Sequence, residues 1–420
     1  MPTIMLQLSR RLARLAALMA LVAPCIGLRP ALAADAVTTW SSLVCSEAIG
    51  DFDPHVAMLM HAAMHDALNA IDPRYARWTA PTPREPPAAD ASPEAAVAAA
   101  AYNVLMGVQP EKTAPIKAAF AAALAAVPDG QSKTAGVALG RAIAAATLTH
   151  RAADRDAPVA AFTQSDEPGH WRATPPDTHA RPRFGRLLPF SGAAVLDLPV
   201  PGPPELGSPA YVAAVAEVRS LGRATSKERS DAQTEAAQFF ANQASSLNFL
   251  DLAIRLLAAR TAPQDIWDSA RTMTLMSLAL SDSFILVSIA KERFHFWRPI
   301  TAIRQGGFGV APEPDWEPLV PTPQHPEHPS GHATECAAGA TVLRMLFGTD
   351  KQPVTYIATD AFFKPAREYA SFTALAEECA ASRIWAGVHF RPASDAGRGL
   401  GEALGDYVVA NLLQRLRENK

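Results

Sequence analysis

The chain has 420 residues, a formal net charge of −3 and a hydrophobic share of 49%, so it is long enough to bury a sizeable core. Residues 1–33 hold four arginines and no acidic residue, so without them the chain has 34 basic against 41 acidic residues, a net charge of −7. That charge makes the remaining chain a poor candidate for binding nucleic acid or an anionic membrane surface.

The first 33 residues have the three parts of a secretory signal peptide. Arg10, Arg11 and Arg14 form a basic region, an apolar run covers residues 15–28, and Ala31-Leu32-Ala33 is a small-residue cleavage site. No later stretch holds the roughly 18 uncharged apolar residues in a row that a bilayer span requires. We therefore expect an exported protein, periplasmic or secreted, without a membrane span after cleavage. Both the general secretory and the twin-arginine route stay open.

Helical patterns dominate the first half of the chain. Apolar residues recur at helical spacing from Val56 to Ile71, and Ala-rich stretches cover residues 95–126 and 135–149. Breaks are expected near Pro110 and at Pro128-Asp129-Gly130. Because alanine is the strongest helix former and sustained β-branched alternation is missing, these stretches predict helices.

The second half continues the helical pattern. Helices are expected to begin near Pro209, Ser226 and Ile266, and to cover residues 273–296, 332–347, 368–385 and 395–416. We predict an all-α fold of one or two packed helical bundles with long Pro-rich loops. After the signal peptide, residues 34–420 would form one domain, with an N-terminal half over 34–225 and a C-terminal half over 226–420.

Three Pro-rich segments interrupt the helices, at residues 81–93, 155–207 and 305–329. A loop as long as 155–207 inside a globular domain is usually functional or covers a site. Of the cysteines outside the signal peptide, Cys45, Cys336 and Cys379 are expected as buried free thiols, and a Cys336–Cys379 bridge stays open.

The first of three motifs in the last third of the chain is a pair of cations. Lys291 and Arg298 are seven residues apart, so we expect them on one helix face, directing two cations at one spot beyond the helix end. The flanking Phe294, Phe296 and Trp297 indicate burial, where cations without an anion would be costly. The alternative is a solvated pair.

The second motif is Pro329-Ser330-Gly331-His332, between a Pro-rich loop and a helix. Small residues at a helix N-terminus let backbone N–H groups approach an anion, which the helix dipole also favours. Ser330 adds a hydroxyl donor and His332 is placed to give or take a proton. A simple helix cap by Ser330 is the alternative.

The third motif runs from Ser382-Arg383 to His389. The Arg383 guanidinium offers two parallel donors to an oxyanion. Gly387 is expected to end the helix, so that His389 turns back toward the arginine. A packed or capping histidine is the alternative.

Together the three motifs resemble vanadium-dependent haloperoxidases and type 2 phosphatidic acid phosphatases. Their shared pattern is a Lys and an Arg-Pro pair, then Pro-Ser-Gly-His, then Ser-Arg with a His six residues after the Arg. The resemblance spans residues 272–404 and extends more loosely to residues 61–67, where His65 and Asp66 are expected to be structural. The sequence around the motifs, over residues 295–304 and 387–391, resembles that of the haloperoxidase branch.

The resemblance implies a role for each site residue. Five residues would hold the equatorial oxygens of the oxyanion: Lys291, Arg298, Ser330, Gly331 and Arg383. His389 would bind vanadium axially, and His332 would do the acid–base work. Vanadate is the implied cofactor, phosphate would occupy the same site, and the reactants would be hydrogen peroxide, a halide and a small organic acceptor.

Two other functions stay open beside the haloperoxidase. One is a soluble phosphatase with His389 as nucleophile and His332 protonating the leaving group. The other is a non-catalytic, export-side helical protein. An oligomer is also left open.

Two positions bear on how the site works. The family often has an Asp four residues after the last His, and Ala393 stands there, so either Asp395 or a backbone carbonyl is expected to orient His389. His325 precedes His332 by seven residues, and in the resembling enzymes a histidine there goes with bromide or iodide more than with chloride. The alternative for His325 is a surface histidine.

Overall fold

The computed structural model describes residues 34–46, 54–81, 89–156, 160–174, 182–183, 187–241, 245–260, 265–357 and 366–416. The predicted signal peptide over 1–33 lies outside these residues, as does most of the Pro-rich segment 81–93. From Asp35 onward the chain forms one compact unit. The division into halves near residue 225 stays a prediction.

The fold is all-α, as predicted, and thirteen α-helices occupy the described residues. They are α2 (Ala36–Val44), α3 (Pro54–Ile71), α4 (Pro93–Val108), α5 (Thr113–Ala125), α6 (Gln131–His150), α7 (Pro209–Leu221), α8 (Asp231–Ala241), α9 (Ser245–Ala258), α10 (Ile266–Phe294), α11 (Pro299–Gln305), α12 (Gly331–Phe347), α13 (Phe372–Trp385) and α14 (Arg391–Asn411). Strands among these residues form two antiparallel pairs: β1 (Ala160–Ala161) with β2 (Pro182–Arg183), and β3 (Val354–Ile357) with β4 (Ala366–Tyr369).

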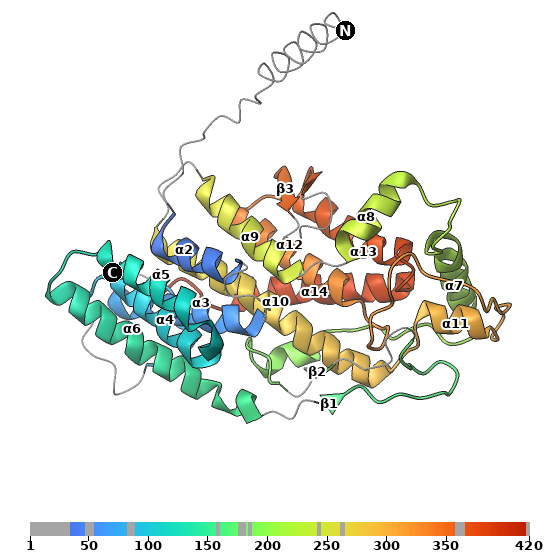
Figure 1. Ribbon diagram of the computed structural model, residues 1–420, viewed down its shortest axis with the longest axis horizontal. Coiled ribbons are helices and arrows are strands. Elements are labelled where there is room, and N and C mark those ends of the chain that lie inside the picture. The colour runs from blue at the N-terminus through green and yellow to red at the C-terminus, as the bar shows by residue number, and fades with distance from the viewer. Residues whose placement is uncertain are drawn as a thin grey trace, which may run out of the picture. The chain divides into compact units, whose positions relative to one another are not determined.

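Helix α10 is the centre of the bundle (Figure 1). It packs against α2, α3 and α9 and also against α12 and α14, so it joins N-terminal to C-terminal helices. By length and composition α10 could cross a membrane, but 89% of its most apolar window is buried inside the protein. Its apolar surface is therefore covered by the surrounding helices, which is the pattern of a core helix.

Buried polar side chains fix how the neighbours of α10 pack on it. His61 of α3 lies 2.8 Å from Ser41 Oγ of α2 through Nε2, and 2.6 Å from Ser277 Oγ of α10 through Nδ1. Burial lowers the pKa of His61 to about 3, so its ring is neutral and accepts one of these bonds. Asp66 accepts the backbone N–H groups of Trp78 and Thr79, both at 2.7 Å, which supports the structural role expected of it.

Helices α12 and α14 approach each other closely along a line of glycines. A Cβ atom at Gly401 would lie 2.2 Å from the carbonyl oxygen of Thr334, and one at Gly397 would lie 2.5 Å from that of Ser330. These glycines therefore set the distance between the two helices, and with it the position of the first turn of α12.

A disulfide joins α12 to α13 through Cys336 and Cys379, whose Cα atoms are 6.5 Å apart. The expectation of buried free thiols is wrong for these two residues, and Cys45 is free, as expected, but half-buried. Tertiary contact brings together two cysteines that are 43 residues apart in sequence, which spacing alone does not reveal.

Most helix predictions are confirmed, with errors at the boundaries. The helix expected near Ser226 begins at Asp231, and the one expected from residue 395 begins at Arg391 and ends at Asn411. The helix expected from residue 368 begins at Phe372, because residues 366–369 form strand β4.

The glycine line predicts a stability difference between two substitutions on α14. Gly401→Ala should lower the free energy of unfolding by roughly 1–3 kcal/mol, because the added methyl group collides with the backbone of α12. Gly399 is the matched control, since it is exposed and a Cβ there would meet nothing within 4 Å. Gly399→Ala should be neutral or add up to about 1 kcal/mol. Denaturant titration of both variants measures this, and equal values would contradict the close approach.

Candidate functional site

The end of α10 and the start of α11 place the first two cations. His295 ends α10 in the left-handed region at φ 49°, and Arg298 is the extended residue before Pro299, the first residue of α11. Lys291 therefore lies on α10 and Arg298 lies just before α11, so the prediction that they share one helix face is wrong. Both are buried, with 3% and 0% of their surface exposed.

Lys291 holds the loop that precedes Ser330. Its ammonium group donates to the carbonyl oxygens of Pro326, Glu327 and Pro329 at 2.6, 2.9 and 2.6 Å. An ammonium group has three donors, so these bonds use all of them. Burial and the neighbouring Arg298 lower the pKa of Lys291 well below its usual value.

Gly387 brings His389 back toward Arg383, as predicted. Gly387 has φ 80° after the last turn of α13, and the N–H groups of Val388 and His389 donate to the Arg383 carbonyl oxygen at 3.2 and 3.3 Å. A Cβ at Gly387 would lie 2.4 Å from the carbonyl oxygen of Gly222, so another residue would not fit there.

The protonation of the His389 ring follows from its two neighbours. Arg298 Nη1 lies 3.1 Å from Nε2, and a guanidinium is always a donor, so Nε2 accepts with its lone pair. Nδ1 therefore carries the proton and donates to Glu327 Oε1 at 2.9 Å. Burial and the charges of Arg298, Lys291 and Arg383 lower the pKa of His389 well below its usual value, which keeps the ring neutral.

Glu327 is the orienting residue that the sequence reasoning missed. It is fully buried and also accepts the backbone N–H of Phe390 at 2.9 Å. Both expected candidates for this role, Asp395 and a backbone carbonyl, are therefore wrong, and Asp395 is exposed. The available signal was a single carboxylate three residues before Ser330. Burial raises the pKa of Glu327 to about 7, against the opposing effect of Arg298 and Lys291.

The first turn of α12 combines a cap with open space. Ser330 accepts the N–H of Ala333 at 3.4 Å and so caps the helix, and its predicted contact with an anion stays a prediction. A Cβ at Gly331 would meet nothing closer than Val287 Cγ1 at 3.8 Å and Glu335 Oε1 at 3.9 Å. His332 follows on the same turn and is half-buried. The helix N-terminus is thus open beside Gly331.

Arg383 is a buried cation with a spare donor. It is 1% exposed, and one terminal nitrogen donates to the Phe240 carbonyl oxygen at 3.1 Å. Its Nε has no hydrogen-bond partner among the described residues. Burial lowers the pKa of Arg383 to about 10, so it keeps its charge at neutral pH. A buried donor without a partner is what a bound anion would satisfy.

The predicted cations therefore converge on one histidine. Lys291, Arg298 and Arg383 all act on the charge of His389. His325 joins them, because its Nδ1 lies 3.0 Å from Arg298 Nη2, so it lies at the cluster and not on a remote surface.

Comparison with known proteins agrees with the resemblance that the three motifs indicate. Residues 271–418 match the family model of the VCPO second helical-bundle domain. The first bacterial vanadium-dependent iodoperoxidase is similar in structure, with 23% identity and a TM-score of 0.72 over 92% of this chain and 97% of that chain. The chain has the fold of the vanadium-dependent haloperoxidases.

A bacterial vanadium-dependent chloroperoxidase is similar in two crystal structures, each 20% identical to this chain. The apo form has a TM-score of 0.66 over 84% of this chain and 92% of that chain. The holo form has a TM-score of 0.64 over 92% of this chain and 93% of that chain. No curated protein sequence matches the chain. The resemblance suggested by the three motifs is therefore confirmed, and at these identities the likeness to the solved structures establishes the fold.

The buried residues of this haloperoxidase-like site fit a tetrahedral oxyanion such as vanadate. The cluster has three buried cations, and burial weakens the ionisation of Glu327, the carboxyl group that contacts His389. Arg383 Nε has no hydrogen-bond acceptor among the described residues, so it could donate to the oxyanion. The lone pair of His389 Nε2 accepts a hydrogen bond from Arg298, and in binding vanadate it would exchange that bond for the metal. Because the Lys291 donors go to carbonyl groups, its predicted direct contact with the anion stays a prediction.

The long Pro-rich segment covers the loop that carries Glu327. The side chain of Gln324 accepts the N–H of Thr174 at 3.0 Å and donates to its carbonyl at 2.8 Å. Nearby, the N–H of Trp171 donates to the His295 carbonyl at 2.9 Å. The described part of this segment therefore packs on the loop before Ser330 and on the end of α10, as a covering loop would.

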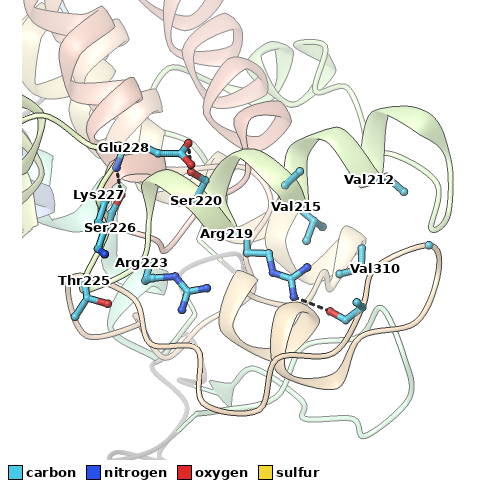
Figure 2. A pocket seen from close by; sticks show the side chains of 13 residues that line it. Val212, Val215, Arg219, Ser220, Arg223, Thr225, Ser226, Lys227, Glu228 and Val310 are labelled. Atoms are coloured by element: carbon cyan, nitrogen blue, oxygen red, sulfur yellow. Dashed lines mark hydrogen bonds between the residues drawn. The ribbon is translucent and has the colours of Figure 1, made fainter.

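A separate groove of about 760 Å³ lies along α7 (Figure 2). Arg219 and Arg223 line it, and both form ion pairs with Glu313. None of the predicted site residues lines this groove. Its cations are compensated within the protein, so the groove adds nothing to the oxyanion cluster.

The Glu327–His389 bond predicts which carboxylate matters for anion binding. Glu327→Ala should weaken vanadate binding about 10–100-fold, because the carboxyl group that accepts the Nδ1 proton sets the orientation and basicity of a ligating histidine. Asp395→Ala is the matched control and should bind as the wild type does, since Asp395 is exposed. Titration calorimetry with vanadate measures both, and a comparable loss in the Asp395 variant would refute the assignment to Glu327.

Proposed function

We propose that this protein is a vanadium-dependent haloperoxidase that binds vanadate through His389 and oxidises a halide with hydrogen peroxide. The observation that carries the proposal is the neutral His389 ring, whose Nδ1 proton is held by Glu327 and whose Nε2 lone pair lies among buried cations. Vanadate bound there would supply the Lewis acid that activates hydrogen peroxide toward the halide.

Each residue of the chain has a separate task in this proposal. Arg298 and Arg383 compensate the charge of the anion, and the N-terminus of α12 at Ser330 and Gly331 offers backbone donors. Lys291 adds a third positive charge and keeps the preceding loop in place. His332, on the first turn of α12, transfers protons to and from the reactants.

His325 bears on the choice of halide. It contacts Arg298 at the edge of the cluster, and its ring lies 6.5 Å from that of Phe162 in the covering segment. We propose bromide or iodide as the halide, since the resembling enzymes associate a histidine in this place with those ions.

Export to an oxidising compartment belongs to the same proposal. Disulfides persist in the periplasm and outside the cell and are rare in the cytosol. The buried Cys336–Cys379 bridge therefore supports the signal peptide expected at residues 1–33.

A soluble phosphatase is the alternative function. The neutral Nε2 of His389 is a nucleophile as well as a ligand, so the same cluster would stabilise phosphoryl transfer through a phosphohistidine. Phosphate and vanadate share shape and similar charge, so the two functions would compete for one site.

A paired assay tests these functions. Vanadate added to the apo-protein should switch on bromide- and peroxide-dependent halogenation of a phenol dye, and prior addition of phosphate should slow this activation. Hydrolysis of a phosphate ester is measured on the same samples. Ester hydrolysis without any vanadate-dependent halogenation would replace the haloperoxidase by the phosphatase.

Substitution of His389 and of His332 should affect vanadate binding and turnover differently. His389→Ala should abolish tight vanadate binding, because it removes the bond from the protein to the metal. His332→Ala should keep vanadate binding and lose turnover by roughly 10²–10⁴-fold, the usual contribution of a general acid–base group. Calorimetry and steady-state rates on both variants separate the roles. Equal loss of vanadate binding in both would show the assignment to be wrong.

A further inference from the structure

A buried carboxyl group on α12 has no task in the mechanism above. Glu335 is 8% exposed and lies one helical turn after Gly331, on the same face. Its Oε1 would be 3.9 Å from a Cβ atom at Gly331, beside the open space at the helix N-terminus. Neither the three motifs nor the resemblance points to this residue.

The neighbours of Glu335 fix which of its oxygens faces the cluster. Ser246 of α9 donates its hydroxyl group to Oε2 at 3.0 Å, which leaves Oε1 as the oxygen nearest Gly331. Arg383 of α13 and Tyr356 of β3 interact electrostatically with the carboxylate, and His332 lies on the preceding turn of α12. Glu335 is therefore close to the cation that carries the spare donor.

An ionised carboxylate in this position opposes anion binding. Two negative charges in a poorly solvated site repel each other, so a carboxylate beside a bound oxyanion raises the free energy of the complex. A carboxylic acid there has the opposite effect, because it donates a hydrogen bond to an anion oxygen. Burial raises the pKa of Glu335 to about 7, so the free protein reaches both forms near neutral pH.

We propose that Glu335 is a further residue of the oxyanion site, which it joins in its protonated form by donating a hydrogen bond from Oε1 to the anion. Anion binding then takes up a proton. The inference rests on the proposed function only in that the cluster binds a tetrahedral oxyanion. It does not depend on peroxide or halide chemistry.

The sign of the pH dependence follows from the two forms. Below the pKa of Glu335 the carboxyl group is protonated and supports the anion, and above it the carboxylate repels the anion, so affinity falls as pH rises through about 7. Tyr356 and Arg383, which interact with Glu335, do not cause this fall in affinity near pH 7. Burial raises the pKa of Tyr356 well above its usual value, and the pKa of Arg383 is about 10. Glu327, whose pKa is also raised to about 7, and His332 are retained in every variant below, so their effects are common to all of them.

Sulfate is a suitable probe, because it stays a dianion across this range and vanadate and phosphate do not. The protonated fraction of a group with a pKa of about 7 falls about ten-fold between pH 6 and pH 8. Wild-type protein should therefore lose about ten-fold more sulfate affinity over that range than Glu335→Gln, whose amide keeps a donor without a charge. Glu377→Gln, an exposed change on α13, is the charge control and should follow the wild type.

Calorimetry in buffers of different ionisation enthalpy gives a second readout. At pH 8 the wild type should take up close to one more proton per bound sulfate than Glu335→Gln does. Ser246→Ala covers the case in which Glu335→Gln does not fold. It removes a hydrogen bond to the ionised carboxylate, so the midpoint of the affinity change should move to higher pH.

Equal pH profiles and proton counts in wild type and Glu335→Gln would overturn the proposal, as would an unmoved midpoint in Ser246→Ala. A proton-linked sulfate site in a protein without halogenation activity would leave this inference standing and remove the haloperoxidase. Failure of the wild type to bind sulfate at any pH in this range would overturn the role of Glu335.

Discussion

The hydrogen bond between His389 and Glu327 is the contact on which the arrangement of the site depends. It joins the loop before α12 to the connection between α13 and α14, and Lys291 at the end of α10 holds the same loop from the other side. Three buried cations surround this pair, and separate burial of each would cost several kcal/mol. The buried carboxyl group of Glu327 offsets part of that cost, and the proposed anion would offset more of it if these distant segments meet at one place.

The packed helices around His389 and Glu327 keep the residues of the site at fixed distances from one another. Helix α10 is buried along its length and carries Lys291 on its last turn, so the cation cannot shift without disturbing the core. The glycines of α14 hold α12 by its first turn, where Ser330 and Gly331 lie. Lys291 and Arg383 lie on packed helices. Arg298 and His389 lie on short connections between such helices, so all four side chains are held in place, and this preorganisation is what electrostatic stabilisation of an anion requires.

The sequence predicted what local rules decide and missed what tertiary contact decides. Alanine content and the punctuation by proline and glycine gave α4, α5, α6 and α12 close to their observed bounds. The left-handed Gly387 and the return of His389 were also foreseeable. The partner of His389 was not, because Glu327 comes from a Pro-rich loop 62 residues away in sequence. Strand β4 was missed because a four-residue strand carries too little periodicity.

The disulfide has a consequence for when the site becomes rigid. Cys336 lies one helical turn after His332, and Cys379 lies one turn before Arg383, so a single covalent link spans the helices that present both residues. A chain that folded in a reducing compartment would carry these helices unlinked. Oxidation would then add the link between them, so an oxidising environment would hold the two helices of the site together more firmly.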